Sequence, residues 1–205
     1  RLACVTGVQT CALPIFLLAT GIGVSLGVVT VKLGRKNSAY IDPIVNVLQA
    51  APELVLLAVA VLLFGVNVQA AIAALFVKGL LPILRNTYSG IRNIDYAVVE
   101  AAKGMGMSSL QILFRLEIPI AMPVILSGIR VASVMAVSTL TLSAYIGVKS
   151  LGVLITRGIA TSSPDALITG SVVTDLLAIV LNFSILWLER ALMRHRGAKT
   201  NEKND

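Results

Sequence analysis

Five long runs of apolar residues constrain this chain more than any other feature of its sequence. They cover residues 16–33, 44–64, 69–84, 120–148 and 166–187. A helix needs roughly 20 mainly apolar residues to cross the hydrocarbon core of a bilayer. Only 13% of the residues are charged, whereas about a quarter are charged in ordinary soluble domains. The sequence therefore predicts an all-α, polytopic membrane protein with five transmembrane helices.

Basic residues in the polar segments predict how these spans are oriented, because loops rich in lysine and arginine stay in the cytoplasm. One predicted side carries Lys32, Arg35, Lys36, Arg85, Arg92, Lys103, Arg115, Arg190, Arg194, Arg196, Lys199 and Lys203. The opposite side has only Lys149 and Arg157. We expect the C-terminus, with a tail over residues 191–205, to be cytoplasmic and the N-terminal end to lie outside. The net charge of +7 then reflects topology, and no nucleic-acid partner is expected.

Residues 5–15, VTGVQTCALPI, resemble a translated sequencing adapter, since the bases of a common short-read adapter encode every residue of the stretch. A signal peptide is the alternative, but the stretch fits the usual charged start, apolar run and small-residue cleavage site poorly. We therefore expect residues 1–15 to be non-native and a transmembrane domain to cover residues 16–190. Both cysteines, Cys4 and Cys11, fall in the non-native stretch, so neither predicts a metal or redox site.

A polar segment over residues 92–118 separates the third and fourth spans and is typical of two short helices. Asp95 can cap the first helix by accepting hydrogen bonds from free backbone N–H groups. The glycines of GMG, residues 104–106, favour the end of that helix. Ser108 and Gln111 have the spacing of a capping box for the second helix. Pro119 is expected to end it.

Two faces of this segment can meet other surfaces. Small residues recur on one face and apolar residues on the other: Ala97, Ala101 and Gly104, and Leu110, Leu113 and Phe114, respectively. The first face lets another surface approach closely, and the second can lie on the ends of the spans. From this pattern alone, both a docking element and a plain interfacial helix remain possible, and the interfacial helix is the commoner of the two.

A twenty-residue motif runs from Glu100 to Pro119. It consists of Glu100-Ala101-Ala102, Gly106 and Leu116-Glu117-Ile118-Pro119. The motif resembles the EAA loop of ABC importer permeases, which reads Glu-Ala-Ala, three residues, Gly, nine residues and Ile-x-Leu-Pro. The resemblance implies the type I ABC importer permease fold, with a cytoplasmic loop whose coupling helices dock into a groove on an ATP-hydrolysing subunit. It assigns this contact to Glu100, Ala101, Ala102 and Gly106, with the glycine allowing a bend.

Three further segments extend the resemblance. They are LLPILRNTYSGIRNID (residues 80–95), EIPIAMPVILSGIR (117–130) and AYIGVKSLGVLI (144–155). They are similar to permeases that import glycine betaine, carnitine or choline, although Lys149 and Ser150 stand where that family's IGxGGLGxxI element has glycines. The resemblance implies a multi-pass subunit of a bacterial cell membrane. It would translocate a small compatible solute delivered by a separate extracytoplasmic binding protein.

The sequence also predicts what the chain needs from partners. It contains no G-x-x-x-x-G-K-[ST] loop, so we expect no ATP hydrolysis of the P-loop kind, no enzyme activity and no cofactor in this chain. By the resemblance, a separate ABC ATPase uses the ATP. Five helices are few to line a closable path, so a second permease copy or a paralogue is expected. Aromatic residues make up only 5% of the chain, so the aromatic cage for a quaternary ammonium is expected on the binding protein.

Four ionisable residues lie inside the predicted spans: Glu53, Lys78, Arg130 and Asp175. Charges at membrane depth are costly and usually paired or functional. Glu53 lies 12 residues before Gly65 and Lys78 lies 10 after Val68, so their depths differ by only about 3 Å. We predict a Glu53–Lys78 ion pair and, by the same reasoning, an Arg130–Asp175 pair. A role in stabilising the bundle is favoured over substrate contact for both.

Three other functions remain open. The chain could be a permease for another small solute, such as an amino acid. It could also be an ion-coupled secondary transporter that uses its buried carboxylates, although that reading leaves the EAA-like loop unexplained. A membrane enzyme is the least favoured, because the sequence has no nucleophile–base set and no metal-ligand cluster.

Overall fold

The structure, a computed structural model, describes residues 3–32, 43 and 45–201. Within these ranges all regular structure is helical, as predicted. The α-helices are α1 (Ala3–Lys32), α3 (Glu53–Phe64), α4 (Val68–Arg92), α5 (Tyr96–Gly104), α6 (Ser109–Ile112), α7 (Ile118–Leu142), α8 (Gly152–Ala160) and α9 (Pro164–Asn201). A π-helical turn (Leu113–Glu117) joins α6 to α7, and a 3₁₀ turn (Ser143–Ile146) follows α7.

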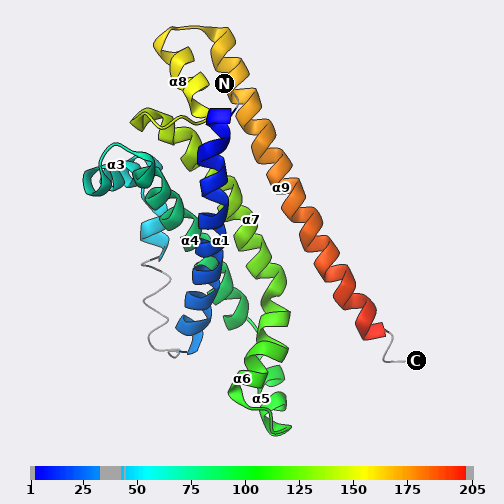
Figure 1. Ribbon diagram of the computed structural model, residues 1–205. Helices are drawn as coiled ribbons and strands as arrows, with labels where there is room; N and C mark the ends of the chain where they lie inside the picture. Colours follow the sequence, from blue (N-terminus) through cyan, green and yellow to red (C-terminus); the bar gives the residue numbers. More distant parts are fainter. Residues whose placement is uncertain (1–2, 33–42, 44, 202–205) are drawn as a thin grey trace.

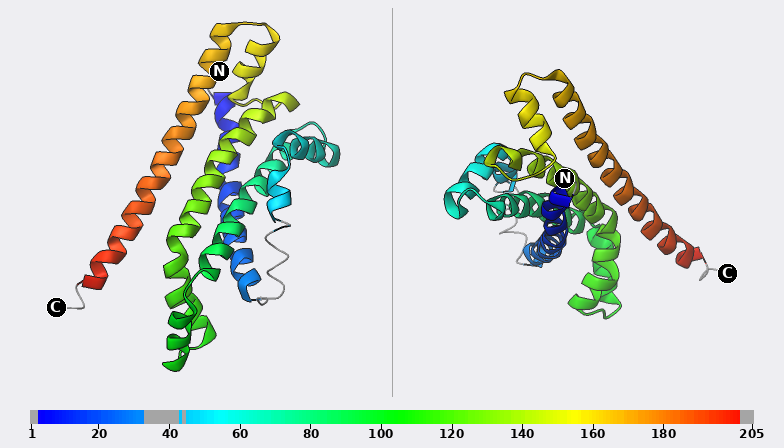
Figure 2. Two further views of the ribbon diagram at one scale, coloured as in Figure 1. Left: turned by 180° about the vertical axis from the view of Figure 1, so that it is seen from behind. Right: turned by 45° about the horizontal axis from the view of Figure 1, so that its top comes forward.

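Helices α1, α4 and α7 pack into a bundle, and α9 packs against α7 and α8 (Figures 1 and 2). Glycines allow the close approach of α1 to α4. A Cβ added at Gly27 would lie 2.6 Å from Cβ of Thr87, and one added at Gly23 would lie 3.0 Å from Cγ2 of Ile83. Helices in a bilayer associate mainly by such close packing of small residues, because lipid tails are as apolar as leucine.

Four helical segments of the described chain are long and apolar enough to span a membrane. They are Pro14–Lys32, Val68–Arg92, Ser109–Ile146 and Pro164–Trp187. These segments contain the predicted first, third, fourth and fifth spans or most of each, and they support a membrane-embedded protein. The third predicted span, residues 69–84, is longer in the structure, because α4 continues to Arg92 rather than ending near residue 84.

The second predicted span, residues 44–64, is not one helix. Residues 45–50 are helical, Ala51 and Pro52 are not, and α3 begins at Glu53 with only 12 residues. Proline has no N–H to donate and disfavours helical geometry at the residue before it. In Figures 1 and 2 α3 lies across the direction of the long helices. The apolar run therefore predicted the helices but not the break between them.

The fourth span is longer than predicted because Pro119 does not end a helix. The chain stays helical from Ser109 to Ile146. The π-helical turn Leu113–Glu117 lies directly before the proline. Such a turn widens the helix by one residue, which removes the need for the N–H that proline lacks and relieves its clash with the preceding turn. The expected stop at Pro119 is thus wrong, and α7 is continuous with α6.

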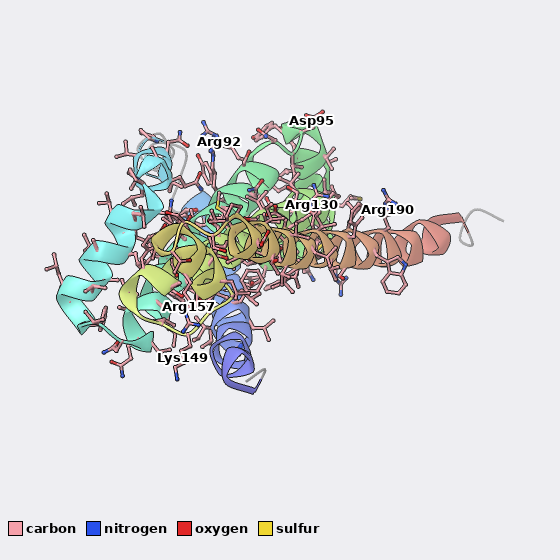
Figure 3. All side chains as sticks on the ribbon, turned by 90° about the horizontal axis from the view of Figure 1, so that it is seen from above. Arg92, Asp95, Arg130, Lys149, Arg157 and Arg190 are labelled. Carbon is pink, nitrogen blue, oxygen red and sulfur yellow. The ribbon has the colours of Figure 1, made fainter. Side chains whose placement is uncertain are left out.

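The two ends of the bundle carry different polar segments. In Figure 1 helices α5 and α6 lie at one end, on the same side as the C-terminal end of α9, and α8 lies at the other end with the start of α1. Figure 3 looks down on the α8 end and shows Lys149 and Arg157 beside the α8 segment. Both of these side chains are exposed. Two groups of basic residues were predicted to lie on opposite sides of a membrane, those near residues 92–115 and those at 149 and 157. They lie at opposite ends of the bundle.

Candidate functional site

The polar segment folds into two short helices, α5 and α6, joined by a bend. Most of the caps and turns predicted for it are confirmed. The side chain of Asp95 accepts a hydrogen bond from the backbone N–H of Ala97 at 3.0 Å, as an N-cap does. The Ser108 side chain accepts from the N–H of Gln111 at 3.4 Å, and the Gln111 side chain accepts from the N–H of Ser108 at 2.9 Å. These reciprocal bonds are the predicted capping box.

Gly106 makes the bend between the two helices. Its φ is +81°, a left-handed conformation that costs other residues energy. The N–H of Met107 donates to the carbonyl of Ala102 at 3.2 Å, and the N–H of Gly106 donates to that of Lys103 at 2.9 Å. This pair of bonds is a Schellman motif, which satisfies two carbonyls at the end of α5. The bend expected at Gly106 is therefore present.

The residues assigned to contact with an ATPase do not all face the same way. Glu100, Ala101 and Gly106 are exposed. Ala102 is 0% exposed, and Val99, three residues earlier, is half-buried. This side of α5 therefore packs on the rest of the chain. Ala102 is therefore buried in this conformation, and its contact with an ATPase, like that of the other three residues, stays a prediction.

Large apolar side chains of the same segment are exposed as well. We call the set the loop surface: Tyr96, Glu100, Ala101, Met105, Gly106, Leu110 and Phe114. Met105 is 75% exposed and Phe114 is 65% exposed, although neither was predicted to be part of a joint surface with the glutamate. Leu113 of the predicted apolar stripe is only 4% exposed and belongs to the inner side. Exposed apolar patches rimmed by polar residues mark interaction sites.

A second polar cluster surrounds the break at Pro52. Nζ of Lys78, on α4, donates to the carbonyl oxygens of Ala51 at 3.0 Å and Gln49 at 3.4 Å. The carboxylate of Glu53 accepts hydrogen bonds from the hydroxyls of two α7 residues, Ser138 at 2.8 Å and Thr139. Both ionisable residues are thus at the break, but each has other partners, and the Glu53–Lys78 ion pair stays a prediction.

Sequence reasoning missed Ser138 and Thr139 because they lie 85 and 86 residues from Glu53. One signal was available. The end of α7 is rich in hydroxyl residues, with SVMAVSTLTLS over residues 133–143. Serine and threonine in a membrane helix can bond to the backbone of their own helix, as Thr141 does to the carbonyl of Val137. Thr139 also has such a bond, to the carbonyl of Met135 at 3.0 Å, and the sequence does not show which hydroxyls additionally reach another helix.

The other predicted pair, Arg130 and Asp175, joins two helices that do pack together, α7 and α9. Arg130 is half-buried and Asp175 is exposed. Their pairing stays a prediction. Among the residues that the structure describes, no three His, Cys, Asp or Glu side chains are grouped as a metal site requires.

The chain resembles known transport proteins over nearly all of its length. The family model of binding-protein-dependent transport system inner membrane components matches residues 19–196. Residues 5–15 lie outside that match, and their origin in a sequencing adapter stays a prediction.

Several curated relatives are more than a third identical to the chain over the aligned residues. The glycine betaine/carnitine/choline transport system permease protein OpuCD of Bacillus subtilis is 37% identical over 186 residues, which are 90% of this chain and 81% of that protein. The osmoprotectant import permease protein OsmY of Salmonella typhimurium is 39% identical over 175 residues, 85% of this chain and 74% of that protein.

A solved structure shares the fold. An inward-facing conformation of the MetNI methionine ABC transporter superposes with a TM-score of 0.76 at 22% identity, covering 93% of this chain and 94% of that chain. Helices in the same arrangement therefore form the permease of a type I ABC importer. Together with the matched family model, this shows that the chain belongs to the family of binding-protein-dependent transport system inner membrane components.

Proposed function

We propose that this ABC importer permease translocates a small compatible solute, namely glycine betaine, carnitine or choline, and receives it from a separate extracytoplasmic binding protein. The choice of solute is supported by the names of the relatives, two of which name these compounds, while a third is named as an osmoprotectant permease. A partner ATPase hydrolyses the ATP, and this chain is a transport subunit without catalysis of its own. A second permease, identical or paralogous, completes the path through the membrane.

One observation carries the proposed coupling to the ATPase. Glu100, Ala101 and Gly106 are exposed at one tip of the bundle, and α5, which carries the first two, is fixed by caps at both ends. The small side chain of Ala101 allows a groove wall to approach, and Glu100 supplies a charge for orientation. The apolar side chains of Met105 and Phe114 supply area that docking removes from water.

A movement of the docked loop passes directly into the bundle. The segment from Ser109 to Ile146 is one helical run, so α6 and α7 move as one body when the ATPase shifts the loop surface. A helix rises about 1.5 Å per residue. The run therefore carries displacement from the loop across the whole membrane without a flexible joint.

The topology follows from the same arrangement. The loop surface and the C-terminal end of α9 lie at the cytoplasmic end, where the ATPase is, and α8 lies at the outer end, where the binding protein delivers the solute. The excess of lysine and arginine at residues near the loop, against only Lys149 and Arg157 at the α8 end, supports this orientation.

The test is co-purification of the ATPase with the permease, followed by uptake of labelled glycine betaine, carnitine and choline. Ala101→Arg places a long side chain on the loop surface and should abolish both recovery of the ATPase and uptake. Ala160→Arg is the matched control, because Ala160 is exposed at the end of α8, far from the loop. Recovery of the ATPase at the control level with Ala101→Arg would contradict the proposed contact.

The solute is tested separately in the unaltered transporter. Each of the three compounds should be taken up, or should compete with uptake, at lower concentration than methionine or proline. Preferential uptake of an amino acid would reject the proposed solute class but leave the ATPase contact standing.

A further inference from the structure

The break at Pro52 exposes backbone groups that a membrane environment leaves without water. Pro52 has φ −56° and ψ 137°, so the helix ends before it and restarts after it. The last carbonyls of residues 45–50 lose their helical partners there. Broken helices occur at membrane depth only where other protein groups satisfy the freed backbone. The question is which groups do so in this chain, and to what they are attached.

Lys78 satisfies backbone carbonyl groups before the break. Its Nζ donates to the carbonyls of Ala51 and Gln49, at 3.0 and 3.4 Å. A cation at the C-terminal end of a helical segment also faces the negative end of its dipole. Lys78 lies one turn after Ala74 on α4, and Ala74 packs in a hydrophobic cluster with Leu57 of α3. The cation therefore holds the break against α4.

Glu53 lies on the other side of the break and bonds to side chains of α7 rather than to the freed backbone. It is the first residue of α3, where the positive end of the helix dipole favours a carboxylate. Its two carboxylate oxygens accept from Ser138 and Thr139 respectively. Thr139 is 1% exposed, so this contact is shielded from solvent. The anion therefore holds the start of α3 against α7.

We propose a polar clamp in which Glu53, Ser138 and Thr139 make α3 follow α7 during transport, while Lys78 holds the segment before the break against α4. These four are positioning residues, which act through the helices that they join. The inference rests on the proposed function, because it needs α7 to be moved at the loop surface. Thr139 lies 30 residues after Ser109 in the same helical run, so the clamp is about 45 Å along the helix from the loop.

With the clamp in place, the break allows α3 to tilt, which a continuous helix would resist. α3 lies across the long helices and is only 12 residues long, so it can tilt about the break without unfolding. Leu142 and Ile146, beyond Thr139 in the same run, pack against the cluster that holds α3 to α4. An axial shift of α7 therefore changes the contacts of α3 at two places, one polar and one apolar.

The experiment measures solute taken up per ATP hydrolysed by the complete transporter, reconstituted in lipid vesicles with its ATPase and binding protein. The double variant Ser138→Ala/Thr139→Val removes both hydroxyls that reach Glu53. It should lower this ratio about tenfold or more, as expected for the loss of hydrogen bonds to a charged group, while co-purification of the ATPase is unchanged. Thr141→Val is the matched control, since Thr141 bonds only within its own helix, to Val137, and it should keep the ratio of the unaltered protein.

Conservative variants separate positioning from plain stability. Lys78→Met should lower the ratio, and Lys78→Arg should restore most of it, because the guanidinium can also donate to the two carbonyls. If the double variant does not accumulate in membranes, Glu53→Gln replaces it. Glutamine keeps one acceptor oxygen and should give an intermediate ratio.

A ratio in the double variant, or in Glu53→Gln, equal to that of Thr141→Val overturns the clamp, even if less protein accumulates. Failure of the proposed function has a different signature. In that case the unaltered permease neither retains the ATPase nor takes up solute in an ATP-dependent manner. An unaltered transporter that couples normally, with clamp variants that do so too, rejects the clamp alone.

Discussion

Replacing Gly106 by alanine tests the bend of the loop surface with little else changed. No atom lies within 4 Å of a Cβ built at Gly106, but its φ is +81°. The substitution therefore adds no clash, and its cost is the conformational cost of placing an L-residue in the left-handed region, about 1–2 kcal/mol. If this energy lowers the population of the docking conformation, affinity for the ATPase falls by a factor of about 5–30.

Gly104 supplies a control only two residues away. It is the last residue of α5, it also has no atom within 4 Å of a built Cβ, and its φ is not positive. Gly104→Ala should leave affinity unchanged or improve it slightly, because alanine stabilises a helix relative to glycine. Gly106→Asn should recover part of the loss, since asparagine enters the left-handed region more readily than alanine.

The assay is a titration of the purified ATPase against full-length permease in lipid nanodiscs, with the three variants and the unaltered chain compared at equal folded amounts. A dissociation constant for Gly106→Ala within twofold of that for Gly104→Ala would refute the reasoning. The bend would then be unnecessary for docking, whatever the loop looks like in the free permease.

Three further predictions address the bundle, the charges and the energy source. Gly27→Val should destabilise the bundle by about 1–3 kcal/mol through its clash with Thr87, whereas Gly21→Val, where nothing lies within 4 Å, should be close to neutral; thermal unfolding in detergent measures both. Lys78→Met should lower the amount of folded protein more than Glu53→Gln/Lys78→Met, if the two charges also interact, and equal losses would leave no coupling between them. Ionophores that collapse proton and sodium gradients should not stop uptake in ATP-loaded vesicles, and a complete stop would favour an ion-coupled carrier.

Local sequence signals predicted the loop well because its structure depends on neighbouring residues. Asp95, the Ser108–Gln111 capping box and Gly106 all act within five residues of the groups that they bond. Such signals are legible in a single sequence. The burial of Ala102 was not legible, because it depends on tertiary packing rather than on neighbouring residues. The motif therefore identified the segment, and only the fold divided its residues into support and surface.

Hydrophobic runs predicted the number of apolar segments but not their continuity. Residues 44–64 contain Pro52, and residues 109–146 contain Pro119 and Pro123. A helix pattern alone cannot resolve their effect, since proline can break a helix or be tolerated in it. The polar contacts of Glu53 were beyond reach for another reason. A carboxylate in a span signals that partners exist, yet the partners come from a helix 85 residues away in sequence.

Pro119 and Pro52 have opposite effects on the helices that contain them: the first leaves a long helix intact, and the second breaks one. At Pro119 the π-helical turn preserves the helix, so α6 and α7 form one continuous helical run. At Pro52 the helix stops: Lys78 of α4 donates to the carbonyl of Ala51 before the break, and Glu53, the first residue of α3, accepts from Ser138 of α7. A continuous second span would resist tilting because every backbone bond along it would oppose the bend. Broken at Pro52, it has two short segments held by side-chain contacts, and a side-chain contact can exchange partners at far lower cost than a helix can unfold. The same residue type thus accompanies a continuous helical run at Pro119 and a break in the helix at Pro52.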